Sequence, residues 1–201
     1  ADGYLDIIYG DGQVGADLVH NDLVTGVHIT GSERTFDAIV WGEAADTKTG
    51  TPRLTKPITS ELGGVGATIV IPGEWTRADI EFQAEHVATQ KLHSSGHTCV
   101  ASQVLVLPAQ WAQRDEFLAA VRVALRDAPA RAPFYPGTRE RLAEFVADNP
   151  DAEILDTNQR VVLLSGVDPN SAHPAFANEF FGPLYVTTEL PGDSVEEYLQ
   201  S

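Results

Sequence analysis

Short runs of apolar and β-branched residues recur along this chain of 201 residues, and stretches with helical periodicity separate them. The runs span residues 5–9, 27–30, 68–71, 104–107, 161–164 and 184–188. Continuous apolar runs of this length are typical of strands that are buried on both faces, and strands that alternate with helices favour parallel pairing. The sequence therefore predicts an α/β fold built on a mainly parallel sheet.

Apolar residues at spacings of three and four predict the helices between these runs. One helix is expected to begin after Thr76, which forms a capping-box pattern with Asp79, and to end near residues 94–96. Its apolar positions are Ile80, Ala84, Val87, Ala88 and Leu92. Two further amphipathic helices are expected around residues 117–125 and 142–146. All three should cover the sheet.

Two polar stretches without periodicity are interpreted as loops. Residues 43–57 carry Gly50, Pro52 and Pro57, and residues 127–137 hold three prolines. The first loop is the expected boundary between an N-terminal lobe of residues 1–58 and a second lobe of residues 59–201.

The charge balance excludes several classes of function. The chain has 13 Lys and Arg against 29 Asp and Glu, a formal net charge of −16 that repels nucleic acids and anionic lipid surfaces. No apolar run is long enough to span a bilayer, and residues 1–10 lack the basic region of a signal peptide. A single cysteine fits a reducing compartment. We therefore expect a cytoplasmic protein without nucleic-acid or membrane partners. Because the chain has no methionine, we also expect it to be a piece of a longer protein.

Cys99 is the first candidate for chemistry, because it follows a loop of small residues, Ser94 to Thr98. Such a loop leaves room for a substrate and directs backbone N–H groups at the sulfur or at an oxyanion beside it. We interpret Cys99 as a nucleophile. The alternative is a small residue buried in the core.

Two further segments carry candidate residues. Glu61 precedes a Gly-Gly turn, and a strand and a helix separate it from Cys99, so its carboxylate could act as a general base on water. The alternative is a solvated surface charge. Thr30, Gly31 and Ser32 end a predicted strand just before a helix, an arrangement that favours phosphate binding. Ser32 could equally cap that helix.

Other segments give weaker signals. The six histidines show no metal-ligand spacing, and no metal site is predicted. His97 is poorly placed to act as a base for Cys99, because only one residue separates them. The segment from Asn178 to Pro183 could simply place two aromatic residues in the core and form a turn, without a role in binding.

Taken in order, four segments resemble the motifs of the aldehyde dehydrogenase superfamily. The matching residues are Thr30-Gly31-Ser32, Glu61-Leu62-Gly63-Gly64, Gly96-His97-Thr98-Cys99 and Glu179-Phe180-Phe181-Gly182-Pro183. The opening stretch of residues 7–15 is also similar to the family's strand, glycine-rich turn and helix. The resemblance covers nearly the whole chain and implies the family's three-layer α/β fold, with part of a Rossmann-like lobe at the N-terminus.

The resemblance also implies roles for these residues. Cys99 would attack an aldehyde to form a thiohemiacetal and then a thioester, and Glu61 would activate the water that hydrolyses it. NAD or NADP would accept the hydride. Glu179 would hold the nicotinamide ribose, Phe181 would pack near the nicotinamide, and Ser32 would lie near the pyrophosphate. The remaining residues implied in cofactor binding are Thr30, Gly31, Leu62 and Gly63.

The chain also departs from the family pattern. The family's upstream Asn and Lys and its C-terminal oligomerisation segment have no counterpart in this chain. We therefore expect the isolated chain to show poor NAD binding and poor turnover. The resemblance implies that the longer parent protein is a homo-oligomer. His97 stands where Gln or Glu is common, and Val65-Gly66-Ala67 replaces a commoner Lys-Asn-Pro. Two alternatives stay open: a CoA-acylating aldehyde dehydrogenase, which Glu61 disfavours, and a non-catalytic dinucleotide-binding or interaction domain.

Overall fold

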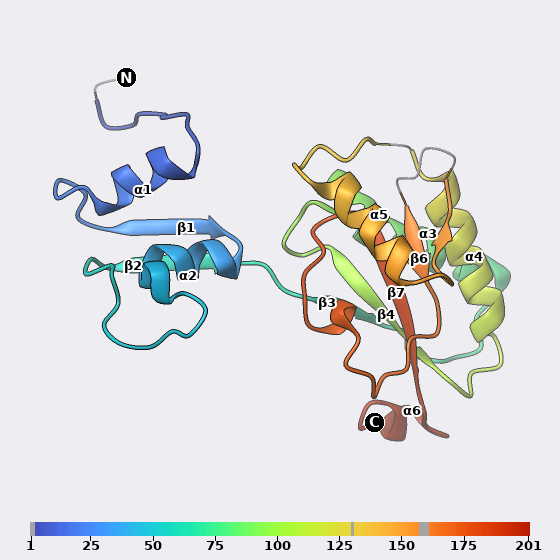
Figure 1. Ribbon diagram of the computed structural model, residues 1–201. Coiled ribbons are helices and arrows are strands. Elements are labelled where there is room, and N and C mark those ends of the chain that lie inside the picture. The colour runs from blue at the N-terminus through green and yellow to red at the C-terminus, as the bar shows by residue number, and fades with distance from the viewer. Residues whose placement is uncertain (1–2, 130, 157–160) are drawn as a thin grey trace. The chain divides into compact units, whose positions relative to one another are not determined.

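A computed structural model describes residues 3–129, 131–156 and 161–201 (Figure 1). The chain forms two compact units, residues 1–63 and 64–201. The sequence analysis placed the boundary between the two lobes after residue 58. Residue 58 begins a strand that lies wholly within the first unit, and the two units divide after residue 63. Within the described ranges, no helix is both long and apolar enough to cross a membrane.

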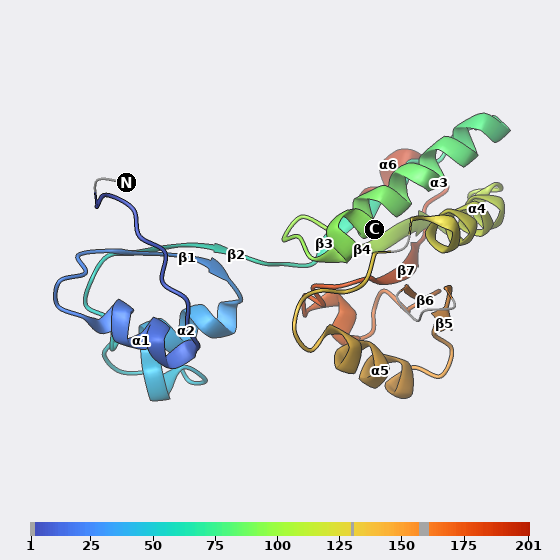
Figure 2. The ribbon, with the colours of Figure 1, turned by 90° about the horizontal axis from the view of Figure 1, so that it is seen from above.

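The first unit is a two-stranded parallel sheet with helices on one side. Its elements are α1 (Gly12–His20), β1 (Val27–Gly31), α2 (Glu33–Trp41), the 3-10 turn η1 (Gly42–Ala44) and β2 (Ile58–Leu62). Figure 2 shows α1 and α2 on the same side of β1 and β2. Asp11 caps α1 and Ser32 caps α2, each through a side-chain oxygen that accepts backbone N–H groups.

Two features of this unit differ from the sequence prediction. Residues 5–9 form no strand and are exposed, because no described strand lies beside them to pair with their backbone groups. Conversely, β2 was not predicted, since its sequence Ile-Thr-Ser-Glu-Leu is largely polar. It forms because each of its residues pairs in register with β1.

The second unit contains a five-stranded sheet in the order β3-β4-β7-β6-β5. All pairs are parallel except that of β5 with β6. The strands are β3 (Gly66–Ile69), β4 (Ser102–Pro108), β5 (Glu153–Ile154), β6 (Val162–Leu164) and β7 (Leu184–Leu190). The helical elements are α3 (Arg77–Leu92), η2 (His93–Gly96), α4 (Arg114–Asp127), α5 (Thr138–Asp148), η3 (Pro174–Phe176) and α6 (Val195–Tyr198). The predicted mainly parallel α/β fold is confirmed.

Helices cover both faces of this sheet and give it three layers (Figure 2). On one face, α3 and α4 pack on alternate residues of the strands, such as Leu105 and Tyr185. On the other face, Phe145 of α5 and Tyr198 of α6 pack on the intervening residues, such as Val186. The predicted helices are all present, and α3 begins with the expected capping box. Every residue of β4 is buried, so this strand is the centre of the core.

Candidate active site

The segments that precede three neighbouring strands converge at one edge of the sheet. Because β3, β4 and β7 are parallel and adjacent, their first residues lie at the same edge. Gly64 and Val65 lead into β3, residues 97–101 lead into β4, and residues 179–183 lead into β7. Parts of three of the four sequence motifs are therefore brought together by the topology alone.

Cys99 lies on an exposed turn at this edge. The backbone N–H of Ala101 donates to the carbonyl oxygen of Thr98 at 3.0 Å, which closes a turn with Cys99 and Val100 at its tip. Cys99 is an exposed free cysteine, and β4 begins three residues later. The alternative of a cysteine buried in the core is therefore excluded, whereas its role as a nucleophile stays a prediction.

The chain reaches this turn through an unusual backbone path. Ser94, Ser95 and Gly96 have φ angles of 51°, 56° and 74°, in the left-handed region. The Ser95 hydroxyl donates to the carbonyl oxygen of Arg131 at 3.0 Å and fixes this path. Gly96 lies so close to the carbonyl group of Gly182 that no Cβ would fit between them. The cysteine segment is thus packed directly on the segment before β7.

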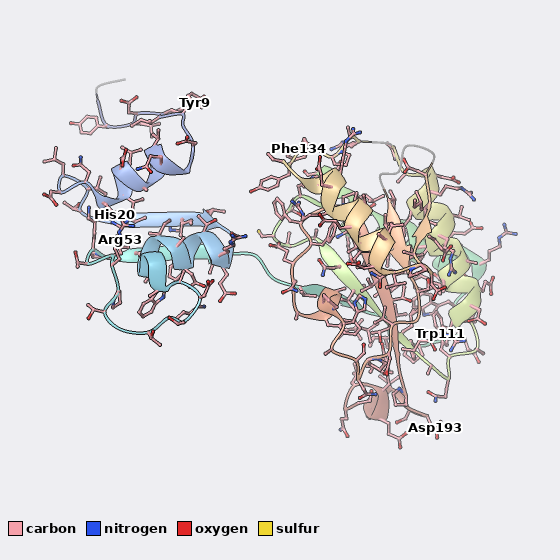
Figure 3. All side chains as sticks on the ribbon, viewed as in Figure 1. Tyr9, His20, Arg53, Trp111, Phe134 and Asp193 are labelled. Carbon is pink, nitrogen blue, oxygen red and sulfur yellow. The ribbon has the colours of Figure 1, made fainter. Side chains whose placement is uncertain are left out.

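The imidazole of His97 connects the cysteine segment to the start of α5 and is poorly suited to act as a base for the Cys99 thiol. It is buried, with Nδ1 3.0 Å from the carbonyl oxygen of Ser94 and Nε2 3.1 Å from the hydroxyl of Thr138. Its ring packs 4.6 Å from that of Phe134, which lies near the start of α5 (Figure 3), and 5.6 Å from that of Phe181. Burial lowers the pKa of His97, partly offset by the Ser94 carbonyl. A neutral ring held at both nitrogens is poorly suited to deprotonate Cys99.

Gln103, which the sequence analysis did not single out, anchors the segment before β7. Its side chain is buried and its amide nitrogen donates to the carbonyl oxygens of Ala175 at 2.8 Å and Asn178 at 2.9 Å. Its amide oxygen accepts the backbone N–H of Phe180 at 2.7 Å. The signal in the sequence was a glutamine directly before the apolar run of residues 104–107, because a glutamine that is buried there needs hydrogen-bond partners.

Glu179 is a half-buried carboxylate held by two other parts of the site. Burial raises its pKa, while a hydrogen bond from the backbone N–H of Gly64 and the positive charge of Lys91 act to lower it. Gly64 belongs to the Glu-Leu-Gly-Gly motif, so this bond joins that motif to the Glu-Phe-Phe-Gly-Pro motif. Phe181, two residues later, has a φ angle of 47°.

The remaining candidates lie in the first unit. In the parallel pair of β1 and β2, Thr30 lies opposite Glu61 and Gly31 opposite Leu62, with Gly63 following. Two motifs that are distant in sequence are therefore adjacent, and Glu61 is exposed. The Ser32 hydroxyl accepts the N–H of Thr35 at 3.1 Å, which confirms the capping interpretation; phosphate binding here stays a prediction.

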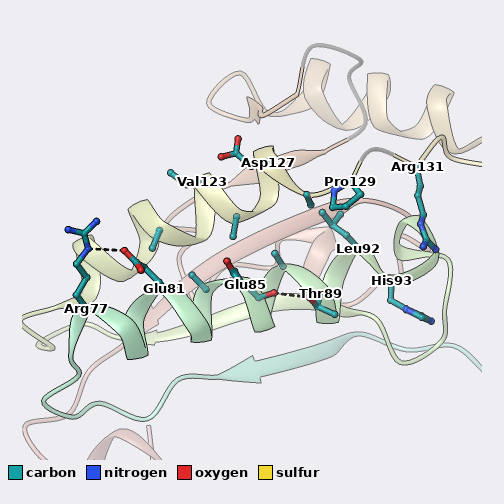
Figure 4. A pocket seen from close by; sticks show the side chains of 15 residues that line it. Arg77, Glu81, Glu85, Thr89, Leu92, His93, Val123, Asp127, Pro129 and Arg131 are labelled. Atoms are coloured by element: carbon teal, nitrogen blue, oxygen red, sulfur yellow. Dashed lines mark hydrogen bonds and ion pairs between the residues drawn. The ribbon is translucent and has the colours of Figure 1, made fainter.

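A separate hollow of about 720 Å³ lies between α3 and α4 (Figure 4). Alanines from both helices line it, together with charged residues such as Glu85 and Asp127. Cys99 does not line it. Among the residues that the structure describes, no group of three His, Cys, Asp or Glu side chains could hold a metal ion.

Comparison with known proteins identifies relatives of the chain. The model of the aldehyde dehydrogenase family matches residues 1–140. No curated protein sequence matches. Among solved structures, the chain is similar to substrate-bound Staphylococcus aureus AldH, with 20% identity, a TM-score of 0.69, and coverage of 98% of this chain and 42% of that one.

Two further structures have a bound cofactor. An indole-3-acetaldehyde dehydrogenase in complex with NAD⁺ has 20% identity and a TM-score of 0.69, over 93% of this chain and 39% of that one. The NADP-dependent glyceraldehyde-3-phosphate dehydrogenase from Bacillus halodurans C-125, in complex with NADP, has 19% identity and a TM-score of 0.67, over 96% and 40%. The chain thus spans about two fifths of the length of these proteins, and the likeness shows a shared fold.

Proposed function

The chain belongs to the aldehyde dehydrogenase family, and we propose that its full-length protein oxidises an aldehyde to a carboxylic acid with NAD or NADP. The observation that carries this proposal is the position of Cys99. Its thiol is exposed on a turn at the edge of the sheet where the segment of Glu179 and Phe181 also lies. An accessible thiol suits covalent chemistry, and a half-buried carboxylate and an aromatic ring from a segment at the same edge of the sheet suit a nicotinamide ribose.

The proposed reaction begins at the sulfur of Cys99. Its thiolate adds to the aldehyde carbon, a C–S bond forms, and the carbonyl electron pair moves to oxygen to give a thiohemiacetal. Glu179 and Phe181 would hold a nicotinamide cofactor, which would supply the hydride acceptor for this carbon and so allow a thioester to form on Cys99. Glu61 then takes a proton from water as the water oxygen attacks the thioester. The C–S bond breaks, the carboxylic acid leaves, and the thiolate of Cys99 is regenerated.

Each unit of the chain offers groups that suit part of a dinucleotide. Glu179 offers acceptor oxygens for ribose hydroxyls, and Phe181 offers an apolar surface for the nicotinamide. Thr30, Gly31 and Ser32 lead into the N-terminus of α2, which favours a phosphate group. Leu62 and Gly63, which follow Glu61, complete the set that we propose for cofactor binding.

The test is aldehyde-dependent formation of NADH or NADPH by the full-length protein, followed by absorbance across a panel of aldehydes. We expect Cys99→Ser to lower turnover by several orders of magnitude, as for other covalent nucleophiles. Ser171→Ala, which alters an exposed hydroxyl in the same unit, should leave turnover unchanged. Turnover that is retained in Cys99→Ser would overturn the proposal. Turnover only in the presence of CoA would identify the acylating alternative.

A further inference from the structure

Lys91 occupies a core position of α3. The buried residues of this helix are Ile80, Ala84, Val87, Ala88 and Lys91, which recur at helical spacing on one face. The Lys91 residue is only 1% exposed. No described residue makes a hydrogen bond or an ion pair with its ammonium group, although buried ammonium groups are normally paired. A lysine in such a place lowers the stability of the fold, which raises the question of what its charge does.

The position of Lys91 in the fold brings it next to the candidate active site. It lies in the last turn of α3, so the chain passes from it through η2 to the turn of Cys99. Gly96 of that connection packs on Gly182, and this contact holds the connection after α3 against the segment that carries Glu179. The opposite charge that acts on Lys91 is the carboxylate of Glu179.

Burial and attraction act in opposite directions on this pair. Burial lowers the pKa of Lys91 to about 7, and the negative charge of Glu179 acts to raise it. Burial raises the pKa of Glu179, and the positive charge of Lys91 acts to lower it. Each group therefore favours the ionised form of the other, while the protein interior favours the neutral form of both.

We propose that Lys91 is a positioning residue for the cofactor, whose buried ammonium group favours the ionised carboxylate of Glu179, the form that accepts hydrogen bonds from the nicotinamide ribose. This inference rests on the proposed function, because it assumes that Glu179 binds the ribose. Lys91 does not touch the reacting atoms in this role. It acts through the charge state of Glu179.

Other ionisable groups nearby do not take this role. His97, from the loop after η2, is buried and has a lowered pKa, and Lys91 and Arg141 of α5 both act to keep it neutral. Tyr185 of β7 is buried beside Ser102, and burial raises its pKa to about 12, so it stays protonated. Among the described residues, Lys91 is the charged group that acts on Glu179, and the pKa of Lys91 is about 7.

The test measures NADH binding by the full-length protein through fluorescence titration from about pH 6 to about pH 9, the range over which Lys91 would lose its proton. We expect Lys91→Met to weaken NADH binding by a factor that grows as the pH falls, by up to about tenfold for each unit by which the change raises the pKa of Glu179, and to have little effect near pH 9. Lys48→Met, a change of the same type at an exposed lysine, should leave affinity unchanged at every pH. A ratio between the affinities of Lys91→Met and wild type that is constant with pH would mean that Lys91 does not act through the charge state of Glu179.

A second measurement does not depend on the cofactor. The ¹³C resonance of the Glu179 carboxyl group, assigned by its loss in Glu179→Gln, reports the pKa of that carboxyl directly. We expect this pKa to rise in Lys91→Met, or in Lys91→Gln if the first variant fails to fold. In wild type, the resonance should show a second, smaller step near pH 7 as Lys91 loses its proton.

The outcomes separate this inference from the proposed function. An unchanged Glu179 resonance, without a second step in wild type, would overturn the role of Lys91 even if NADH binds. If wild type binds neither NADH nor NADPH, the proposed function and the role of Lys91 in cofactor binding both fail. If the Glu179 resonance still responds to Lys91→Met in that case, the experiment would show only that the charges of Lys91 and Glu179 interact.

Discussion

Gly96, before the cysteine turn, and Gly182, before β7, are in backbone contact with no space for a side chain between them. The two glycines are distant in sequence, yet their contact fixes how the cysteine segment meets the segment of Glu179. Gly96 also has a φ angle of 74°, which residues with a Cβ rarely adopt. One position therefore combines a steric and a conformational requirement for glycine.

We expect Gly96→Ala to lower the free energy of unfolding by about 2 kcal/mol or more, since both requirements are violated. It should also displace the turn of Cys99 and reduce turnover. Urea unfolding of the chain measures the first effect. Gly12→Ala in α1 is the control, because a Cβ there meets no atom within 4 Å. Equal stability of the two variants would mean that the contact with Gly182 can relax.

Cys99 should react with iodoacetamide in the folded chain at neutral pH. Its thiol is exposed and is the chain's single cysteine, so one adduct is expected by mass spectrometry. In the full-length protein, bound NAD⁺ or an aldehyde should slow the reaction by covering the site. Labelling that requires denaturation would contradict the exposed turn.

Glu61→Gln in the full-length protein should separate the two halves of the proposed reaction. Without the carboxylate base, a burst of reduced cofactor should appear, and steady turnover should then fall about 100-fold or more. Stopped-flow absorbance measures the burst, and mass spectrometry detects the acyl group on Cys99. The absence of both would show that Glu61 serves an earlier step or the pairing of β1 with β2.

Gln103→Leu should loosen the segment that carries Glu179. The change removes three hydrogen bonds and leaves two carbonyl oxygens and one N–H without their partner. We expect a loss of about 3 kcal/mol in the free energy of unfolding of the chain, together with weaker NADH binding by the full-length protein. Gln110→Leu, after the other end of β4, is the matched control and removes one exposed hydrogen bond. A similar loss in both variants would argue against a special role for Gln103.

Lys91→Met should stabilise the chain in a pH-dependent way. The unfolded chain holds this proton up to about pH 10.5, but the folded chain holds it only to about pH 7. Between these values the unfolded state binds more protons, so the wild-type free energy of unfolding should rise with pH. The variant should lack this rise and should exceed wild type most at or below pH 7, by up to about 5 kcal/mol. Urea unfolding near pH 6 and pH 9 measures the difference, and a gain that does not vary with pH would contradict the buried charge.

The extent to which the sequence predicted the fold depends on how local each signal is. Thr76 and Asp79 lie three residues apart and predicted the start of α3 correctly, since a capping box needs no distant partner. Residues 5–9 are apolar enough for a strand, but strand formation also needs a neighbour, and none is described beside them. β2 shows the converse, because its pairing with β1 outweighs its polar composition.

The same distinction applies to the candidate site. The four motifs could be found because each is short and contiguous. Gln103 was missed because its partners are 72 to 77 residues further along the chain. Lys91 was missed although a signal existed: it continues the apolar stripe of Ile80, Ala84 and Val87, where a charged residue has no local reason to be.

The left-handed path of Ser94, Ser95 and Gly96 limits how this segment can vary over evolutionary time. β-Branched residues are strongly disfavoured at three consecutive positions with positive φ, while glycine, asparagine and aspartate adopt such angles most readily. An insertion or deletion here would change the direction in which the chain enters β4 and would displace the thiol of Cys99. Substrate preference is therefore expected to diversify through the loops that surround the turn, while the turn itself admits only a narrow set of sequences.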